Sequence, residues 1–481
     1  MNKQVKILIS LAAVFVLLCG GVAALLLTDG PEVSGGETSS EPENTAVTLL
    51  QKAEAELVRI ESSTGFYAEY DPESEKLTIP ALEGLPLDES VLDYILRSAA
   101  TVTGQREIEG GELSDFGITE ESPTVTITYS DGSTAVLKIG AGVPGASTPS
   151  SYVLFEDRVY VMYDMHIRYF IAEPSEYIST QITPANYDSS SGACLYKTKN
   201  LTFGLTDKAF AINRNTDATS AAQFYTGYYC LVPDGQNFAP DDTVISNVSD
   251  SLFGMTGEVA AFALSEEELD LDAFGLWENY LTAAVTAVGI TDDSEVLTFC
   301  VDASQPAEGK IYLHVRGSNV VYSIDEADAP LWYKSELSDF YAEKIFVPAL
   351  ENVGKLTLET PEYTLIFSIN RDGGGNIENA DVLKTEGNEN ASAVISSTDF
   401  SAFFDLLTKT KQYGTAQISE GEALSPVLRI TVEYSDGTKE TLELNAGPSL
   451  QVYASANGGA PWLLKSDYAK GLLEAALGFF R

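Results

Sequence analysis

The chain has 481 residues, of which 44% are hydrophobic and 21% are charged, so it can bury cores and differs from an intrinsically disordered polyanion. Acidic residues outnumber basic residues by 71 to 28, which gives a formal net charge of −43. A surface of this sign repels phosphate backbones, so the composition argues against a nucleic-acid partner and is typical of a solubilising surface.

An uncharged apolar segment at residues 7–27 is long enough to cross a bilayer as an α-helix. Lys3 and Lys6 precede this segment and acidic residues follow it, which favours a cytoplasmic N-terminus. We therefore expect residues 1–28 to form a cytoplasmic tip and a single-pass transmembrane helix in the cell membrane. The C-terminal domain is then extracytoplasmic.

A cleaved signal peptide and a lipoprotein are the two alternatives for the apolar segment. A signal peptide has a shorter apolar region, of about 7 to 15 residues, and a cleavage site after it. Here residues 22–24, Val-Ala-Ala, are followed by three more leucines. Lipidation would use Cys19, but the bulky Leu18 stands before it. A permanent anchor is therefore the favoured interpretation.

The remainder of the chain is predicted to contain a stalk and three modules. Residues 29–46 are rich in Gly, Ser, Pro and Glu, a composition typical of a flexible linker. The modules are predicted at residues 47–182, 183–335 and 336–481, because a turn-and-hairpin pattern recurs in these parts of the sequence.

The pattern is clearest in the first module, where a short turn ending in Phe-Gly precedes two alternating segments. Residues 124–129 and 134–139 alternate between apolar and polar around a Ser-Asp-Gly turn, which is typical of a β-hairpin. A second hairpin and a short helix are expected to follow. The residues that define the turn and the hairpin are Leu113, Phe116, Gly117, Asp131 and Gly132.

The second and third modules repeat parts of this pattern. Phe274 and Gly275 repeat the turn in the second module, whereas Asp436 and Gly437 repeat the hairpin turn in the third. The third module lacks the Phe-Gly turn. Apolar residues at helical spacing predict one helix before each hairpin, preceded by one or two strands. The predicted helices are residues 88–100, 241–252 and 397–409.

The predicted fold class is therefore α+β: an N-terminal transmembrane helix followed by three repeated modules of antiparallel β-hairpins with short helices. Cys194, Cys230 and Cys300 follow the apolar segment, and this odd number gives no disulfide framework. Cys194 and Cys230 would pair if neighbouring strands brought them together. Isolated buried thiols are the favoured alternative.

The turn and hairpin resemble an uncharacterised bacterial family called domain of unknown function 4340. Its members carry an L-x-x-F-G-L turn, a V-x-V-x-Y-x-D-G hairpin and a V-Y-x-V strand, which residues 113–118, 125–132 and 159–161 match here. The resemblance implies an N-terminally anchored envelope protein, and some members are associated with ABC transporters of the gliding-motility type. The family has no catalytic residues to transfer to this sequence.

Few residues in the sequence indicate chemistry. The two histidines, His166 and His314, lack ligand partners at metal-binding spacing, so we interpret them as surface or edge residues. The glycine-rich residues 371–376 lack the ending of a phosphate loop and are predicted to form a hairpin turn. Acidic residues at 241–242 and 266–268 are expected to cap helices. We therefore expect no catalytic residue, no cofactor and no metal.

The densest aromatic cluster is the best candidate for an interaction surface. Tyrosines on both sides of a strand are most often explained by sheet packing, and an exposed recognition face is the alternative. The candidate residues are Phe224, Tyr225, Tyr228 and Tyr229.

The sequence therefore favours a non-enzymatic, membrane-anchored accessory or scaffold protein of the cell envelope, with an envelope or transporter protein as partner. A surface module that binds glycan or peptide is the alternative hypothesis. A hydrolase that uses scattered carboxylates is the least favoured.

Overall fold

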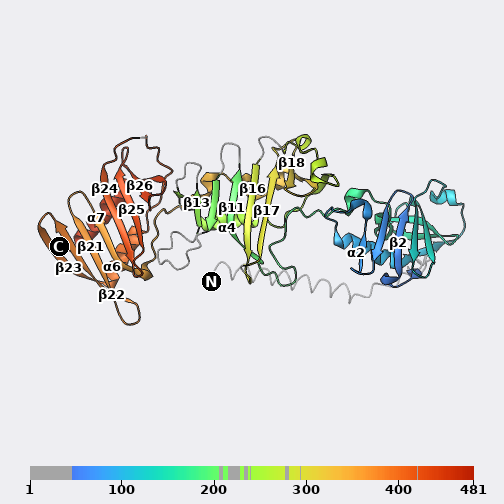
Figure 1. Cartoon of the computed structure of the whole chain (residues 1–481), viewed down its shortest axis with the longest axis horizontal. Helices are drawn as coiled ribbons and strands as arrows, with labels where there is room; N and C mark the ends of the chain where they lie inside the picture. Colours follow the sequence, from blue (N-terminus) through green and yellow to red (C-terminus); the bar gives the residue numbers. More distant parts are fainter. Residues whose placement is uncertain are drawn as a thin grey trace, which may run out of the picture.

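The computed structural model describes most of the chain from residue 46 onward, and Figure 1 shows three β-sheet modules that follow one another in a row. The apolar segment at residues 7–27 and residues 29–45 of the expected stalk lie outside the described residues. The described ranges are 46–204, 210–214, 228–231, 237–238, 240–276, 281–292, 294–419 and 421–481.

Module 1 is built on one eight-stranded antiparallel sheet. Its strands are β2 (Leu57–Ser62), β3 (Tyr67–Asp71), β4 (Lys76–Thr78), β6 (Arg106–Ile108), β7 (Thr124–Tyr129), β8 (Thr134–Gly142), β9 (Ser150–Phe155) and β10 (Arg158–Tyr163). Their order across the sheet is β4-β3-β2-β7-β8-β9-β10-β6. A separate two-stranded sheet joins β1 (Val47–Gln51) to β5 (Thr101–Gly104). The helices are α2 (Glu89–Ala100) and α3 (Asp164–Ile167).

Module 2 contains a nine-stranded sheet. Its strands are β11 (Tyr196–Gly204), β12 (Phe210–Arg214), β13 (Tyr228–Leu231), β14 (Asn237–Phe238), β15 (Glu258–Phe262), β16 (Leu281–Gly289), β17 (Val296–Ala303), β18 (Lys310–Val315) and β19 (Val320–Asp325). Their order is β14-β13-β12-β11-β16-β17-β18-β19-β15. The helices are α4 (Asp242–Asp250) and α5 (Leu331–Lys334).

Module 3 contains an eight-stranded sheet. Its strands are β20 (Val353–Glu359), β21 (Thr364–Arg371), β22 (Ile377–Glu386), β23 (Glu389–Ser396), β24 (Pro426–Tyr434), β25 (Lys439–Ala446), β26 (Gln451–Ala456) and β27 (Pro461–Lys465). Their order is β23-β22-β21-β20-β24-β25-β26-β27. The helices are α6 (Ser397–Leu407) and α7 (Ser466–Gly478).

The three modules share one topology, in which two meanders of strands are joined at the middle of the sheet. The first strands of the two meanders pair antiparallel: β2 with β7, β11 with β16, and β20 with β24. The first strand of each pair also carries a register shift near its beginning, as between Leu57 and Arg59 and between Val353 and Lys355. The prediction of repeated modules rich in antiparallel hairpins and short helices is therefore confirmed.

The predicted hairpins are confirmed, whereas the prediction of one or two strands before each helix is wrong. Three strands of the main sheet precede α2, and four precede α4 and α6. The additional strands include β22 and β23, which have few buried positions: Ala380 and Val382 in β22 and Ile395 in β23. Their pairing to a neighbouring strand, not their own composition, fixes them in the sheet.

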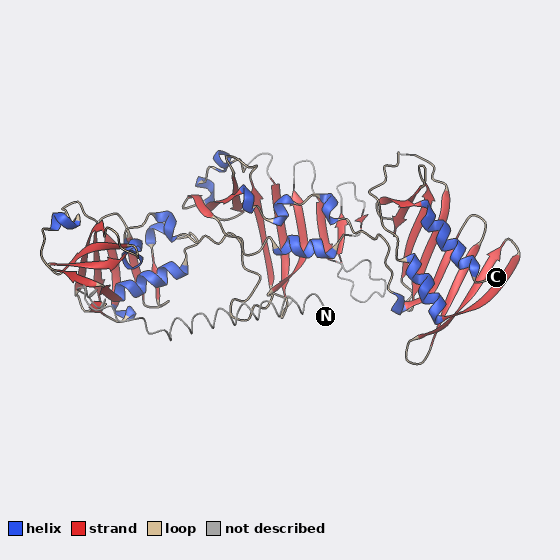
Figure 2. Cartoon of the chain, turned by 180° about the vertical axis from the view of Figure 1, so that it is seen from behind, coloured by secondary structure: helices blue, strands red, loops and turns tan. Residues whose placement is uncertain are grey.

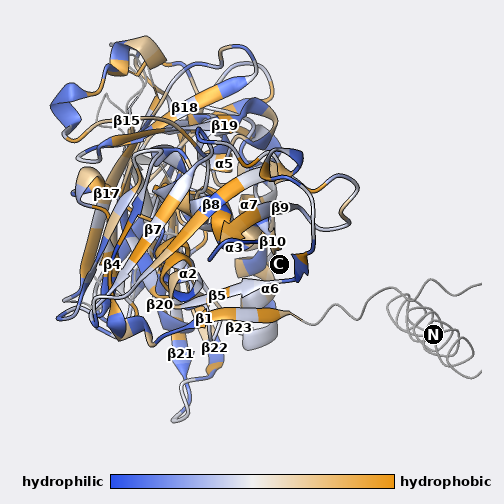
Figure 3. Cartoon of the chain, turned by 90° about the vertical axis from the view of Figure 1, so that its right-hand side faces the viewer, coloured by the Kyte–Doolittle hydropathy of each residue, from blue (hydrophilic) through white to orange (hydrophobic). Residues whose placement is uncertain are grey.

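Alternation between apolar and polar residues explains which side of each sheet is buried. In β7, Val125, Ile127 and Tyr129 are buried, while the threonines between them are partly exposed. The hydropathy along β7 and β8 is visible in Figure 3. The Tyr129 hydroxyl donates a hydrogen bond of 2.7 Å to the carbonyl of Ala99, which ties the end of α2 to this side of the sheet.

Helices lie across one side of the sheets, as Figure 2 shows most clearly for modules 2 and 3. In module 3 the ring of Phe367 on β21 stacks against Phe403 of α6 with centroids 5.0 Å apart. Phe479, which follows α7, contacts the same Phe403 ring at 5.9 Å. The predicted apolar stripe of this helix, Phe400, Phe403, Phe404 and Leu407, is buried throughout.

The predicted helix starts are confirmed by their caps. The Asp88 side chain accepts the N–H groups of Ser90 and Val91 at the start of α2. Asp241 accepts two N–H groups at the start of α4 in the same way, as expected for this acidic pair. Each cap satisfies donors that the first turn of a helix leaves without partners.

Candidate functional site

The Phe-Gly turn of module 1 fastens a loop to the sheet. Residues Leu113–Phe116 form a 3-10 helix, and Gly117 ends it with φ of 65°. The Phe116 ring packs against Tyr152 of β9, with centroids 5.0 Å apart. A Cβ on Gly117 would lie 2.7 Å from the Cβ of Ala141, so both the backbone angle and the close approach require glycine.

The same fastening recurs in module 2. Leu271–Phe274 form the 3-10 helix, Gly275 ends it with φ of 65°, and Phe274 contacts Tyr312 of β18 with centroids 5.0 Å apart. Tyr152 and Tyr312 occupy equivalent strands. The Phe-Gly turns therefore hold the second hairpin of modules 1 and 2, and their contacts are packing contacts.

The aspartates of the hairpin turns are also structural. Asp131 accepts hydrogen bonds from the Ser133 N–H and hydroxyl at 2.9 and 2.6 Å, and Gly132 follows with φ of 80°. A hydrogen bond from Lys52 is the largest cause that lowers the pKa of Asp131, followed by that of Ser133. Module 3 repeats the turn.

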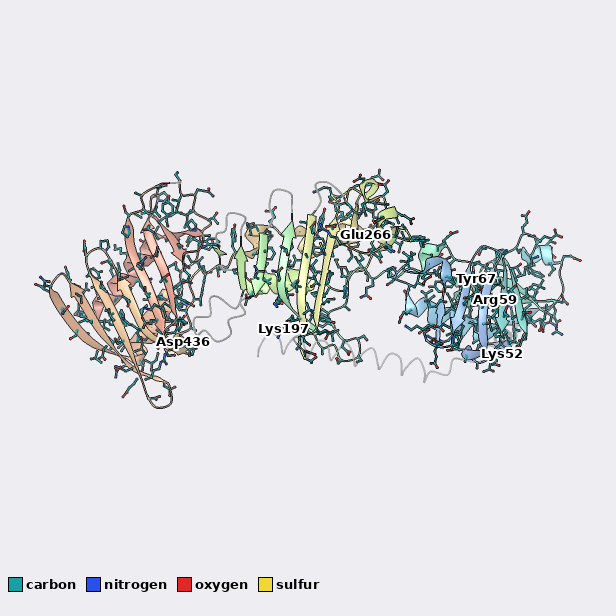
Figure 4. The ribbon with its side chains drawn as sticks, viewed as in Figure 1. Lys52, Arg59, Tyr67, Lys197, Glu266 and Asp436 are labelled. Carbon is teal, nitrogen blue, oxygen red and sulfur yellow. The ribbon has the colours of Figure 1, made fainter. Side chains whose placement is uncertain are left out.

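In the third module Asp436 accepts the Thr438 N–H at 2.9 Å, and Gly437 has φ of 83°. Figure 4 labels Asp436 at the lower side of its module, on a loop between two strands. The glycine-rich residues 371–376 likewise join two strands, β21 and β22, which confirms the predicted hairpin turn.

The interpretation of both histidines as surface or edge residues is wrong for His314. The His314 side chain is 1% exposed, its Nε2 lies 3.0 Å from the Ser318 carbonyl oxygen, and its Nδ1 has no hydrogen-bond partner. His166 is half-buried, and its Nδ1 lies 2.9 Å from the Tyr94 hydroxyl. Burial lowers the pKa of His166.

His314 is buried because the segment before the Phe-Gly turn covers it. Glu266 in this segment accepts the Gly317 N–H at 3.0 Å, and its Oε1 lies 3.7 Å from His314 Nε2. Residues 266–268 were expected to cap a helix. They instead form a single 3-10 turn that Ser265 precedes, and Glu266, labelled in Figure 4, bonds to the neighbouring hairpin.

An ion pair with a buried carboxylate, which the sequence pattern did not indicate, lies next to His314 in the sheet. Asp302 of β17 pairs with His314 of β18 and is 5% exposed. Arg316 donates to both Asp302 oxygens at 2.8 and 2.9 Å, and the Thr282 hydroxyl donates at 2.7 Å. Cys300 lies two residues before Asp302 on β17, and burial raises the pKa of its thiol.

A groove lies at the junction of modules 1 and 2, and we call it the junction groove. Its volume is about 620 Å³. The connecting segment lines one side at Thr180, and the opposite side comes from β18, β19 and the residues after α4. The principal lining residues are Met255, Glu258, Lys310, Leu313, Asp325 and Asp328.

Charge in the junction groove is dominated by carboxylates. The Lys310 ammonium lies 3.0 Å from Asp325 and 3.1 Å from Glu258, and these hydrogen bonds raise its pKa. Asp328 adds a further carboxylate to the lining. The lining also includes Met255, whose sulfur accepts the indole N–H of the buried Trp332 at 3.2 Å. Carboxylates beside apolar side chains such as Met255 and Leu313 suit a positively charged, partly apolar ligand.

The side chains of the predicted aromatic interaction surface lie outside the described part of the structure. Phe224 and Tyr225 lie outside the described residues, and Tyr228 and Tyr229 are described only by their backbone in β13. Cys194 is a free thiol at the surface, so its interpretation as a buried thiol is wrong. Cys300 is free and partly buried.

The described part of the chain contains neither a membrane-spanning helix nor a metal-binding group of side chains. From residue 46 onward, no described helix has the length and apolar character needed to span a bilayer. Nor do the described His, Cys, Asp and Glu side chains gather in a group of three that could hold a metal ion.

Comparison with known proteins identifies a family. A family model described as a domain of unknown function (DUF4340) matches residues 78–201 and 236–424, roughly two thirds of the chain. No curated protein and no solved structure matches. The matched residues include the Phe-Gly turns of modules 1 and 2 and the first meander of module 3. The chain therefore belongs to the DUF4340 family of domains of unknown function.

Proposed function

We propose that this chain is a non-enzymatic, membrane-anchored protein of the cell envelope that acts outside the cytoplasm as a scaffold or accessory component, with an ABC transporter as a candidate partner. The observation that supports this role most directly is the way in which the modules are joined. Each connecting segment is hydrogen-bonded to the modules on both sides of it, which restricts how the three sheets move relative to one another.

The connection between modules 1 and 2 is anchored on both sides. On the module 1 side, the Asp88 N–H donates to the Tyr177 carbonyl at 2.9 Å. On the module 2 side, the Ile182 N–H donates to the Met255 carbonyl at 2.7 Å, and the Gly257 N–H donates to Thr180 at 2.9 Å. These backbone bonds restrict the hinge between the modules.

The connection between modules 2 and 3 uses similar contacts. The Asp241 N–H donates to the Phe340 carbonyl at 2.8 Å, and the Phe340 ring is buried against Phe203 of β11. The next residue, Tyr341, packs edge-on against Trp462 of module 3 with centroids 4.8 Å apart. A protein of this construction suits a role as a spacer that holds partners at set distances from a membrane.

Recovery of partners from native membranes tests the proposal. The tagged full chain would be cross-linked in cells and purified, alongside a chain in which an unrelated cleavable export signal replaces residues 1–28. We expect the anchored chain to recover an envelope or transporter protein and the released chain to recover much less at equal expression. Equal recovery by both chains, or no envelope partner with either, would contradict the proposal.

The exposed thiol of Cys194 gives a separate test of the proposed location. A membrane-impermeant maleimide added to intact protoplasts is expected to label the chain, and a Cys194→Ser variant is expected to lose most of the label. Labelling that requires cell lysis would place the modules in the cytoplasm.

The junction groove favours a second candidate function, the binding of a basic peptide. Its carboxylates and apolar lining residues match a segment that carries Lys or Arg beside apolar residues. A double substitution, Glu258→Lys with Asp328→Lys, is expected to abolish binding of a basic peptide library to the full chain. Val58→Lys, a surface change in module 1, serves as the matched control. Binding that the double substitution leaves unchanged would place the peptide elsewhere.

A further inference from the structure

Strand β23 forms an outer edge of the third sheet, at the far end of the molecule from module 1 (Figure 1). All eight of its residues pair with β22 without a register shift. In antiparallel pairing, alternate residues of an edge strand direct their N–H and C=O groups away from the sheet. Within the described part of the chain, β22 is the only strand that pairs with β23, so this row of backbone groups is open.

The other edges of the three main sheets are short, irregular or covered. Strands β4 and β6 have three residues each, and β14 has two. Strand β15 has five residues and a register shift against β19. Strand β27 is covered, because the Tyr413 N–H donates to Leu463 and the Leu463 N–H donates to Gly414.

These are the features by which proteins prevent sheet edges from associating. Strand β23 is long and regular and contains neither Pro nor Lys, and its one charged residue, Glu389, stands at its first position. An edge of this kind is competent to pair with another strand.

The side chains of β23 are mostly uncharged. Residues 390–396 carry no charge, although the whole chain has a net charge of −43. Val394 is 70% exposed, and Leu383 on the neighbouring strand is 39% exposed. Leu383 pairs with Ser392, so Leu383, Ser392 and Val394 lie on the same side of the sheet. An uncharged edge of this kind is where two acidic chains repel each other least.

We propose that β23 pairs antiparallel with β23 of a second copy of this chain, which joins the two third modules into one continuous sheet. A twofold axis at Ser392 pairs Asn390 of one copy with Val394 of the other. Glu389 then lies opposite Ile395, so the two glutamates do not face each other. A twofold contact of this type is closed and self-complementary. A strand from another protein would have to match this length and neutrality, whereas a second copy does so by identity.

The proposal is independent of the scaffold role and is tested by the mass of the full chain in detergent micelles. Sedimentation equilibrium over a wide range of concentrations is expected to give the protein mass of two chains. A Val394→Lys variant places a charge at the edge and is expected to weaken the association at least tenfold. Val58→Lys is the matched control, because Val58 is 40% exposed on the central strand β2 and lies in another module.

Hydrogen exchange locates the contact. In the wild type, the amides of residues 389–396 are expected to exchange more slowly as the protein concentration rises. The Val394→Lys variant is expected to show no such slowing. The circular dichroism spectra of the two proteins are expected to be the same. A chain that remains monomeric, or a dimer that Val394→Lys leaves intact, would overturn the proposal. Protection of β23 that appears only when other membrane proteins are added would assign the edge to a foreign strand and would equally overturn it.

Discussion

Glu440 on β25 occupies in module 3 the position that Ala135 on β8 occupies in module 1, and each side chain is only 3% exposed. Both residues follow the same Tyr-Ser-Asp-Gly turn sequence. The Glu440 Oε1 atom has no hydrogen-bond partner. Burial raises the pKa of Glu440 to about 7 from an ordinary value of 4.5, and a hydrogen bond with Tyr434 acts in the opposite direction. A repeated hairpin thus holds a small apolar residue in one copy and a buried acid in another.

We expect module 3 to lose stability as the pH rises. Because the pKa of Glu440 is higher in the folded state than in the unfolded state, the folded state binds more protons between pH 4.5 and pH 7. Stability is therefore full below pH 4.5, falls across this window, and remains lower by roughly 3 kcal/mol above it. Urea unfolding at pH 5 and pH 8, with hydrogen exchange read on β24 and β25, measures the loss.

A Glu440→Gln variant provides the control, because its side chain does not titrate. The pH dependence of exchange in β24 and β25 should largely disappear in this variant, while exchange in β7 and β8 of module 1 should stay as in the wild type. A variant that keeps the full wild-type dependence would show that another group causes it.

Local sequence signals predicted the hairpins and the helix starts. Alternation of apolar and polar residues around Asp131 or Asp436 defines two strands and a turn within a few residues, and an acid at position 88 or 241 marks a helix start. Each of these signals depends on neighbours in the chain, so no knowledge of the tertiary structure is needed to read them.

Features that depend on distant pairing were not predicted. His314 is buried because residues near Glu266 pack over it. The two meanders of each module form one sheet because their first strands pair, as β20 does with β24. Strand β23 is largely exposed and buries only Ile395, so its sequence lacks the apolar and polar alternation that predicts a strand. Nothing in the alternation of one strand reveals which segment will lie above it or beside it.

The two Phe-Gly turns should respond differently to the same substitution. Gly117→Ala combines a left-handed backbone angle with a Cβ placed 2.7 Å from Ala141, whereas Gly275→Ala has the same angle but no atom nearer than 3.8 Å. We expect Gly117→Ala to cost about 3 kcal/mol and Gly275→Ala about 1 kcal/mol. Urea unfolding with local hydrogen exchange in each module compares them. Equal losses would show that the contact with Ala141 relaxes without cost.

The pair formed by Asp302 and Arg316 should be asymmetric. The Asp302 side chain is 7% exposed and the Arg316 side chain is 51% exposed. Removing the arginine leaves the buried Asp302 carboxylate without its charged partner, although the Thr282 hydroxyl still donates to it. Removing the carboxylate leaves the Arg316 guanidinium, which water can reach. We therefore expect Arg316→Gln to cost about 2 kcal/mol and Asp302→Asn about 1 kcal/mol, because a buried carboxylate that loses its charged partner costs more than a half-exposed guanidinium that keeps its contact with the Thr282 hydroxyl at 3.3 Å.

An exposed ion pair supplies the reference for this comparison. Lys470 and Glu474 are 3.9 Å apart with side chains 73% and 67% exposed, so Lys470→Gln should change stability by less than about 0.5 kcal/mol. Hydrogen exchange in β17 and β18 measures the first two variants, and exchange in α7 measures the third. If Asp302→Asn proved more costly than Arg316→Gln, the carboxylate would be stabilised chiefly by Thr282 and the sheet, and the arginine would contribute little to its burial.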